Sequence, residues 1–287
     1  MRLRNALIIG IAVLTLCACS LVRVSYGNGP SLALWWLDGY LDLDEAQEAA
    51  ARPLLRDWFA WHRATQLPDY ARWLAIWRDR ADGEVSADEL CRWTDLSRER
   101  LWTAIDAALP AGAQLLPGVT PAQWAHLERK LADQRAEDRD KFAPASAEER
   151  RAKALDRAID RAESSYGSLN DAQRRLLAEA LAVSPMDMTR WLEDRERRQR
   201  LFVAALRAAQ AERDASRRLA ALRLGLRMLM QPADADSAAR QAGWQAHGCA
   251  MAARLHASTT TAQRQHLKGR LAAWEEDVRA LAAAGAP

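Results

Sequence analysis

The stretch Thr120-Pro121-Ala122-Gln123 decides the fold, because it marks the start of a helix and recurs in related form along the chain. The side-chain oxygen of Thr, Ser, Asp or Asn can accept a hydrogen bond from one of the free backbone N–H groups at the start of a helix. A Gln or Glu three residues later can bond back to the capping residue. The same pattern of cap, any residue, Ala and Gln occurs at Asp44–Gln47, Asn170–Gln173 and Thr260–Gln263. An amphipathic run follows each of the four, so each predicts a helix start.

Related signals mark further helix starts. Ser86–Glu89 and Ser146–Glu149 have the Ser-x-x-Glu form of a capping box, and Pro185 follows Ser184 at a first helical position. Pro53 predicts a kink or restart within the first helix. With the spacing of apolar residues, these signals predict helices over residues 45–65, 68–81, 87–108, 121–142, 147–165, 171–182, 185–214, 216–230, 237–256 and 261–283.

The composition favours helix throughout the chain. Ala, Leu, Arg and Glu are abundant, whereas Gly contributes only 13 of the 287 residues and β-branched residues are few. We therefore expect an all-α fold, a bundle or irregular array of about nine mostly antiparallel helices. The Gln residues of the four related starts are 76, 50 and 90 residues apart, which is too irregular for a solenoid.

The N-terminus has the layout of a secretory signal. Two Arg residues precede an apolar run over residues 6–18, which is shorter than the roughly 20 residues that a membrane-spanning helix needs. The run ends in Leu16-Cys17-Ala18-Cys19, which resembles the bacterial lipobox. That resemblance implies that Cys19, rather than Cys17, becomes the lipidated N-terminus of the mature protein. An ordinary cleaved signal peptide and an uncleaved anchor helix are the alternatives.

On this interpretation the chain has three parts. Residues 1–18 are the signal peptide, residues 19–31 a lipidated tether, and residues 32–287 a helical periplasmic domain that could divide near residues 110–119. Ser20 follows Cys19, where lipoproteins retained at the inner membrane often have Asp. We therefore expect a lipid-anchored protein at the periplasmic face of the outer membrane, held by the several acyl chains of one modified residue.

The charge balance excludes one class of partner. Loss of Arg2 and Arg4 with the signal leaves 39 basic against 38 acidic residues, a formal charge of +1. A nucleic-acid-binding protein would need a clustered basic face, so we expect no nucleic-acid partner. The charged stretch over residues 128–163 mixes both signs at helical spacing and is expected to be a solvated face.

Cys91 and Cys249 are the two thiols left in the mature chain. In an oxidising compartment an even pair favours a disulfide, which would here tie the N-terminal part of the chain to the C-terminal part. Two buried, unpaired thiols are the alternative.

Tryptophan is concentrated over residues 35–102, where eight of the 12 Trp residues lie. At helical spacing such residues usually build a core. The functional interpretation is a groove that accepts an apolar segment or a partner helix. Trp35 and Trp36 are adjacent, so one of them could instead meet a membrane interface. The candidate partner-binding aromatics are Trp35, Trp36, Trp58, Trp61, Trp73 and Trp77.

Signals for catalysis and metal binding are weak. The chain has no nucleophile elbow, Gly-rich phosphate loop or HExxH motif. Asp38, Asp42 and Asp44 could in principle act as paired carboxylates, but acidic residues at a helix start also complement its dipole. His247, Cys249 and His256 lack the spacing of a zinc site. We therefore expect a non-enzymatic protein without a metal or cofactor.

Two resemblances to known families can be stated. The cap-x-x-Gln starts resemble the Leu-Thr-x-x-Gln motif of the small periplasmic stress proteins that include Spy and CpxP, which are helical, cradle-shaped chaperones or signalling inhibitors. Val119–Gln123 and Leu169–Gln173 match best, although Asn170 replaces the Thr in the second. The chain is about twice as long as those proteins.

The second resemblance covers nearly the whole chain. The lipobox, Trp35–Asp38 running to Asp44, Trp61-His62-Arg63 with Leu67-Pro68-x-Tyr70, and Thr260–Arg264 resemble a proteobacterial lipoprotein family of unknown function. It implies an envelope lipoprotein and supplies no activity.

Together these observations predict a factor that binds envelope or periplasmic proteins, with a chaperone-like or holdase role. An adaptor with a single envelope partner is the alternative, and a cell-wall hydrolase that uses the clustered carboxylates is a second one.

Overall fold

The computed structural model describes residues 22–142 and 146–284. Within these residues the chain is helical, and no strand is present in them. After a helical turn over residues 22–27 come α2 (Gly29–Leu41), α3 (Glu45–Thr65), α4 (Leu67–Arg80), α5 (Ala87–Leu115), the 3-10 helix η1 (Leu116–Gly118), α6 (Pro121–Phe142), α7 (Ala147–Tyr166), α8 (Asp171–Ala182), α9 (Met188–Ala211), α10 (Ala215–Met230), α11 (Ala235–Ala257) and α12 (Thr261–Ala283).

The all-α class is confirmed, but the described part of the chain holds more helices than the nine expected. The main addition is α2, where Pro30 occupies the first turn, in which its missing N–H leaves no helical bond unmade. Helix α5 also continues past Pro110 to Leu115, because Leu109 and Ala113 are buried against Leu222 of α10.

The expected tether over residues 19–31 is helical from Val22 onward. Asn28 N donates to Val24 O, and Leu32 N donates to Asn28 O, so helical bonding continues into α2. Gly29 lies so close to α3 that a Cβ atom there would be 2.3 Å from the Phe59 ring. The segment therefore belongs to the folded body. Residues 1–21, including the predicted lipidation site Cys19, lie outside the described residues.

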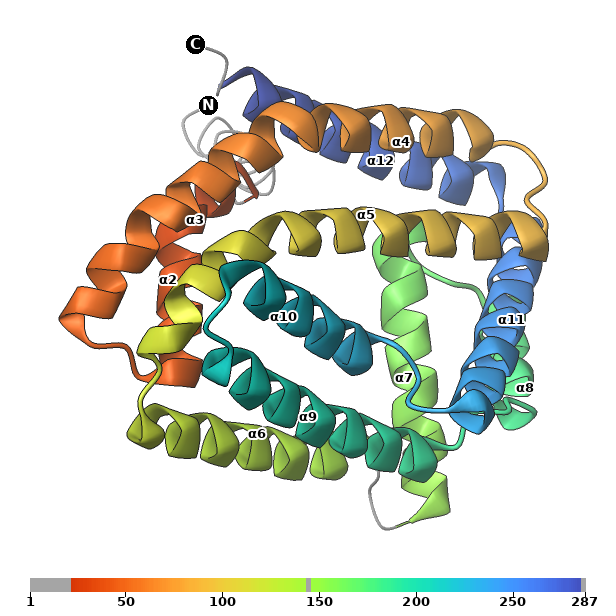
Figure 1. Ribbon diagram of the computed structural model, residues 1–287. Helices are drawn as coiled ribbons and strands as arrows, with labels where there is room; N and C mark the ends of the chain where they lie inside the picture. The colour runs from red at the N-terminus through yellow and green to blue at the C-terminus, as the bar shows by residue number, and fades with distance from the viewer. Residues whose placement is uncertain (1–21, 143–145, 285–287) are drawn as a thin grey trace, which may run out of the picture.

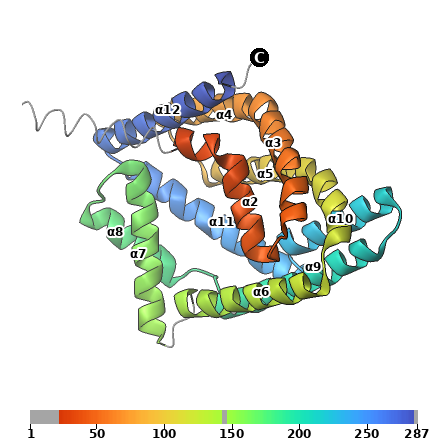
Figure 2. The same ribbon diagram turned by 90° about the vertical axis from the view of Figure 1, so that its left-hand side faces the viewer.

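The helices pack in pairs (Figure 1). Helix α4 lies along α12, α9 along α10, and α5 contacts both α10 and α11. Turned by 90°, the structure has α2 at the front, while α7 and α8 lie at the other end (Figure 2). In the described part of the chain, no helix is both long and apolar enough to cross a membrane.

The four related helix starts meet in two pairs. Each forms a capping box, with the cap side chain accepting from the Gln backbone N–H and the Gln side chain bonding back. Gln47 and Gln123 exchange side-chain hydrogen bonds of 3.1 and 2.5 Å. Gln173 and Gln263 exchange bonds of 2.8 and 2.9 Å. We call these the two glutamine pairs.

Each glutamine amide also donates to a backbone carbonyl of the opposite loop. The acceptor always lies two residues before the opposite cap: Gly118, Asp42, Ser258 and Ser168, at 2.8, 2.9, 3.0 and 2.9 Å. The same side chain therefore caps its own helix and fastens the loop before a second one. The eight predicted cap residues Asp44, Gln47, Thr120, Gln123, Asn170, Gln173, Thr260 and Gln263 all take part.

The apolar core is divided among small clusters. One surrounds Trp124 of α6, a second surrounds Leu177 of α8, and a third joins α5 to α10 around Leu222. Gln173, only 1% exposed, is the largest side chain among the described residues with an exposure below 2%. Polar pairing is thus as central to this fold as apolar packing.

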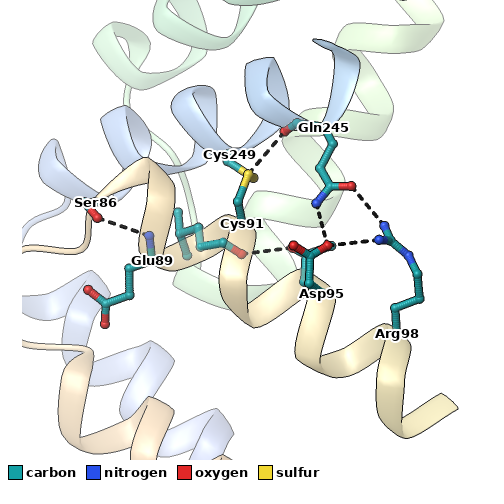
Figure 3. The surroundings of a disulfide bond; sticks show 9 residues. Ser86, Glu89, Cys91, Asp95, Arg98, Gln245 and Cys249 are labelled. Atoms are coloured by element: carbon teal, nitrogen blue, oxygen red, sulfur yellow. Dashed lines mark hydrogen bonds and ion pairs between the residues drawn. A yellow bond between two sulfur atoms is a disulfide. The ribbon is translucent and has the colours of Figure 1, made fainter. Parts of the chain in front are cut away.

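A disulfide joins α5 to α11 through Cys91 and Cys249, whose Cα atoms are 5.6 Å apart (Figure 3). Beside it, Gln245 donates to Asp95 at 2.9 Å and accepts from Arg98 at 3.0 Å. The predicted pairing of the two cysteines is therefore confirmed in the structure.

Candidate functional site

An apolar groove of about 570 Å³ lies between α3, α4, α5 and α12. We call it the aromatic groove, because half of the 12 residues that line it carry aromatic rings. Its main lining residues are Trp58, Trp73, Trp77, Leu101, Trp274 and Val278.

Neighbouring side chains hold the rings of the groove in place. Trp58 Nε1 donates to the carbonyl oxygen of Ala104 at 3.0 Å, which fixes α3 against α5. Trp77 packs edge-on against Trp73 and stacks on Trp93, with ring centroids 5.4 Å apart in each pair. Such contacts add to the stability that burial provides, so they favour the observed positions of the rings.

Arg100 is the charged residue that lines the groove. Its guanidinium lies over the Trp73 ring, 4.2 Å from the centroid, and its Nε donates to Asp69 at 2.7 Å. The charge is thus satisfied by a carboxylate and a ring face. The groove consequently favours an uncharged, apolar occupant.

His62 forms part of the inner wall. Its Nδ1 lies 2.8 Å from the Tyr26 hydroxyl, and its ring stacks on Trp58 with centroids 4.8 Å apart. Burial lowers the pKa of His62 and raises the pKa values of Tyr26 and Tyr70. All three groups are therefore neutral at neutral pH, and the wall stays uncharged.

The rim of the groove is open to solvent. Leu101 is 51% exposed and Trp274 is 39% exposed. Apolar side chains clustered at the mouth of a hollow are typical of a surface that binds another molecule.

Three of the six predicted aromatics, Trp58, Trp73 and Trp77, line the groove. Trp61 packs beside Trp58 outside it. Trp35 and Trp36 lie on α2 and are exposed.

The α12 wall of the groove was not predicted from the sequence. Trp274 and Val278 lie about 200 residues after α4 in the chain. They reach the groove because α12 packs along α4. Periodicity shows which face of α12 is apolar, but no local signal shows which helix that face will meet.

Two of the three clustered carboxylates, those of Asp38 and Asp44, accept hydrogen bonds from the backbone. Asp38 accepts from the Leu43 N–H at 2.9 Å, and Asp44 caps α3. Asp42, with φ of 51°, ends α2 in the left-handed region. These contacts account for the carboxylates as helix-end residues.

The three residues considered as metal ligands have other partners. Cys249 is in the disulfide. His247 Nε2 lies 2.9 Å from the carbonyl oxygen of Ala180, and His256 bonds to Tyr166 and to the carbonyl oxygen of Gly83. Among residues 22–142 and 146–284, no group of three or more His, Cys, Asp or Glu is placed to hold a metal ion.

Comparison with known proteins gives one match. Residues 39–225 match the model of a family of unknown function, DUF6279. This range covers α3 to α9 and most of α10, including both Gln47 and Gln123 of the first glutamine pair. No curated protein and no solved structure matches the chain.

Proposed function

The chain belongs to the DUF6279 family, and we propose that it is a non-enzymatic protein-binding factor that holds apolar segments of other envelope proteins in the aromatic groove. The observation that carries the proposal is the groove itself, with its aromatic lining, its compensated charge and its exposed rim. An unfolded or partly folded protein exposes the kind of apolar segment that such a surface shields from water.

The proposed location is the periplasmic face of the outer membrane, with a lipid on Cys19. The Leu-x-Ala-Cys sequence supports the anchor, and the disulfide between Cys91 and Cys249 fits an oxidising compartment. Palmitate labelling of the cell envelope tests the anchor. We expect label on the wild-type chain and none on the Cys19→Ala variant.

The holdase role is tested by light scattering from an aggregating unfolded client mixed with the purified protein. We expect suppression of aggregation at near-stoichiometric ratios. Two changes at the groove, Leu101→Asp and Trp274→Ser, should abolish it, because each removes apolar surface from the rim and the first also adds a charge.

Matched controls are available elsewhere on the surface. Leu224 is 55% exposed and Trp244 is 41% exposed, and neither lines the groove. Leu224→Asp and Trp244→Ser should therefore leave suppression unchanged. If wild type suppresses nothing, or if the groove variants suppress as well as wild type, the groove is not a client site. One dominant band in envelope crosslinking would then favour an adaptor with a single partner.

A further inference from the structure

Exposed apolar side chains gather at the N-terminal end of the described chain. Among the described residues, five of the 13 exposed large apolar side chains lie between residues 22 and 36, and Trp35 and Trp36 are 73% and 58% exposed. The five are Val22, Val24, Leu32, Trp35 and Trp36. We call Leu32, Trp35 and Trp36 the outer face of α2.

The outer face of α2 follows from helical spacing. Leu32, Trp35 and Trp36 are three and four residues apart, so they lie on one side of the helix. Leu34, on the opposite side of the helix, is buried. Figure 2 shows α2 at the front of the structure. The outer face has no charged side chain and so offers nothing to an ionic partner.

The segment before α2 is fixed to the body. Arg23 Nε donates to Asp277 of α12 at 2.6 Å, and the Tyr26 hydroxyl bonds to His62 of α3. Because Asp277 is buried, its ion pair with Arg23 is only partly screened by solvent. The body therefore cannot swing freely about residues 22–28.

The distance from the outer face of α2 to the proposed anchor is short. Val22 is the third residue after Cys19, and three residue steps of extended chain span roughly 10 Å. From Val22 to Trp36 a helix would advance at most about 21 Å, because each residue adds about 1.5 Å. A lipid on Cys19 would thus hold this face next to the bilayer.

We propose that the outer face of α2, together with Val22 and Val24, lies in the interfacial layer of the bilayer, a proposal that rests on the lipid anchor at Cys19. Trp is the side chain best suited to that layer, where its ring meets both apolar and polar surroundings. The contact orients the body, because a lipid at one point and a ring pair at a second point define a fixed side toward the membrane.

The test uses the purified full-length mature protein in vesicles of phosphatidylethanolamine and phosphatidylglycerol that include a lipid with brominated acyl chains. Bromine quenches nearby tryptophan. We expect the brominated lipid to lower the emission of the wild type. Most of that loss should disappear in the Trp35→Ser/Trp36→Ser double variant. Trp244→Ser, which removes an exposed Trp from α11, should keep it in full.

Equal quenching of the double variant and the wild type would overturn the proposal. High salt should leave the quenching unchanged, because the outer face of α2 carries no charge. The single Trp35→Ser change, at the more exposed of the two rings, provides a variant with the least risk to folding. An oligomeric state altered by these variants, with unchanged quenching, would assign the face to a second copy and overturn the membrane contact.

The membrane contact of α2 can be tested separately from the lipid on Cys19. If mass spectrometry finds no lipid on Cys19, flotation of the unlipidated chain with the same vesicles still tests the face. Weak flotation that the double variant loses supports the membrane contact. Absent flotation of the wild type, or equal flotation of both, overturns it.

Discussion

Gln173 and Gln263 lie 90 residues apart in the chain, and their side-chain amides donate to each other at 2.8 and 2.9 Å. Each also fastens the loop in front of the other's helix, through Ser258 O and Ser168 O. A helix cap is normally a local device. Here it is also the long-range contact that brings the starts of α8 and α12 together.

Truncation of this pair should cost much stability. Gln173→Ala leaves the Gln263 amide and the Ser258 carbonyl without their partner at a buried site, so we expect a loss of about 3 kcal/mol in the free energy of unfolding. Gln47→Ala removes the equivalent contacts at a more exposed site and should cost about 1 kcal/mol. Urea denaturation measures both. Equal costs would show that burial does not set the strength of the pairs.

Acidification should weaken the fold through buried histidines. Burial lowers the pKa values of His62 and His256, so the folded state holds both rings neutral. The unfolded chain binds protons first as the pH falls below about 6.5, so the stabilising contribution is complete above that pH and is lost below it.

The surroundings of His256 act on its pKa in both directions, and burial is the largest cause of the lowered pKa. The Tyr166 hydroxyl and the Gly83 carbonyl face its ring, and Arg264, Arg80 and Glu89 lie nearby. The two arginines lower the pKa of His256, whereas the Gly83 carbonyl and Glu89 raise it.

Urea denaturation between about pH 7.5 and pH 5, on either side of the histidine pKa, measures the effect. His256→Gln should flatten the pH dependence, because the glutamine side chain does not titrate. If a variant that lacks both His62 and His256 still loses stability at low pH, other groups cause that loss.

The disulfide should raise the gel mobility of the denatured chain and the free energy of unfolding of the native protein. It closes a loop of 158 residues between α5 and α11. The oxidised chain should run faster than the reduced chain on a denaturing gel. The Cys91→Ser/Cys249→Ser variant should lose up to about 5 kcal/mol of stability, because its unfolded state gains freedom. Unchanged mobility, with two thiols that react with a titrating reagent, would show that the bridge does not form.

Glycine to alanine changes should have opposite signs at two helical sites. A Cβ atom at Gly225 in α10 would lie 2.8 Å from the Ala205 Cβ of α9, so Gly225→Ala forces the paired helices apart and destabilises the protein. At Gly243 in α11 nothing lies within 4 Å, so Gly243→Ala should stabilise by up to about 1 kcal/mol through helix propensity. Thermal unfolding of the two variants checks both signs. A rise in Tm for both would mean that α9 and α10 do not need the small residue.

The sequence predicts the helices better than their partners. The bounds of α3, α6, α8 and α12 agree with those expected, because capping residues act within one turn. Helix α2 was missed, since Gly27, Gly29 and Pro30 indicate a linker whereas Pro30 in fact opens the helix. The glutamine pairs and the α12 wall of the groove depend on contacts across 76 to about 200 residues, for which the local pattern carries no signal.

The two glutamine pairs also set an order for assembly. A chain that emerges N-terminus first can close the first pair once Gln123 has appeared, when less than half of the 287 residues are out. Gln173 must wait for Gln263, which follows 90 residues later at the start of α12. Until then the bonds from Gln173 to Ser258 and from Gln263 to Ser168 cannot form, so the second pair does not yet join the starts of α8 and α12. Synthesis of the first turn of α12 is thus the step that allows α8 and α12 to be joined.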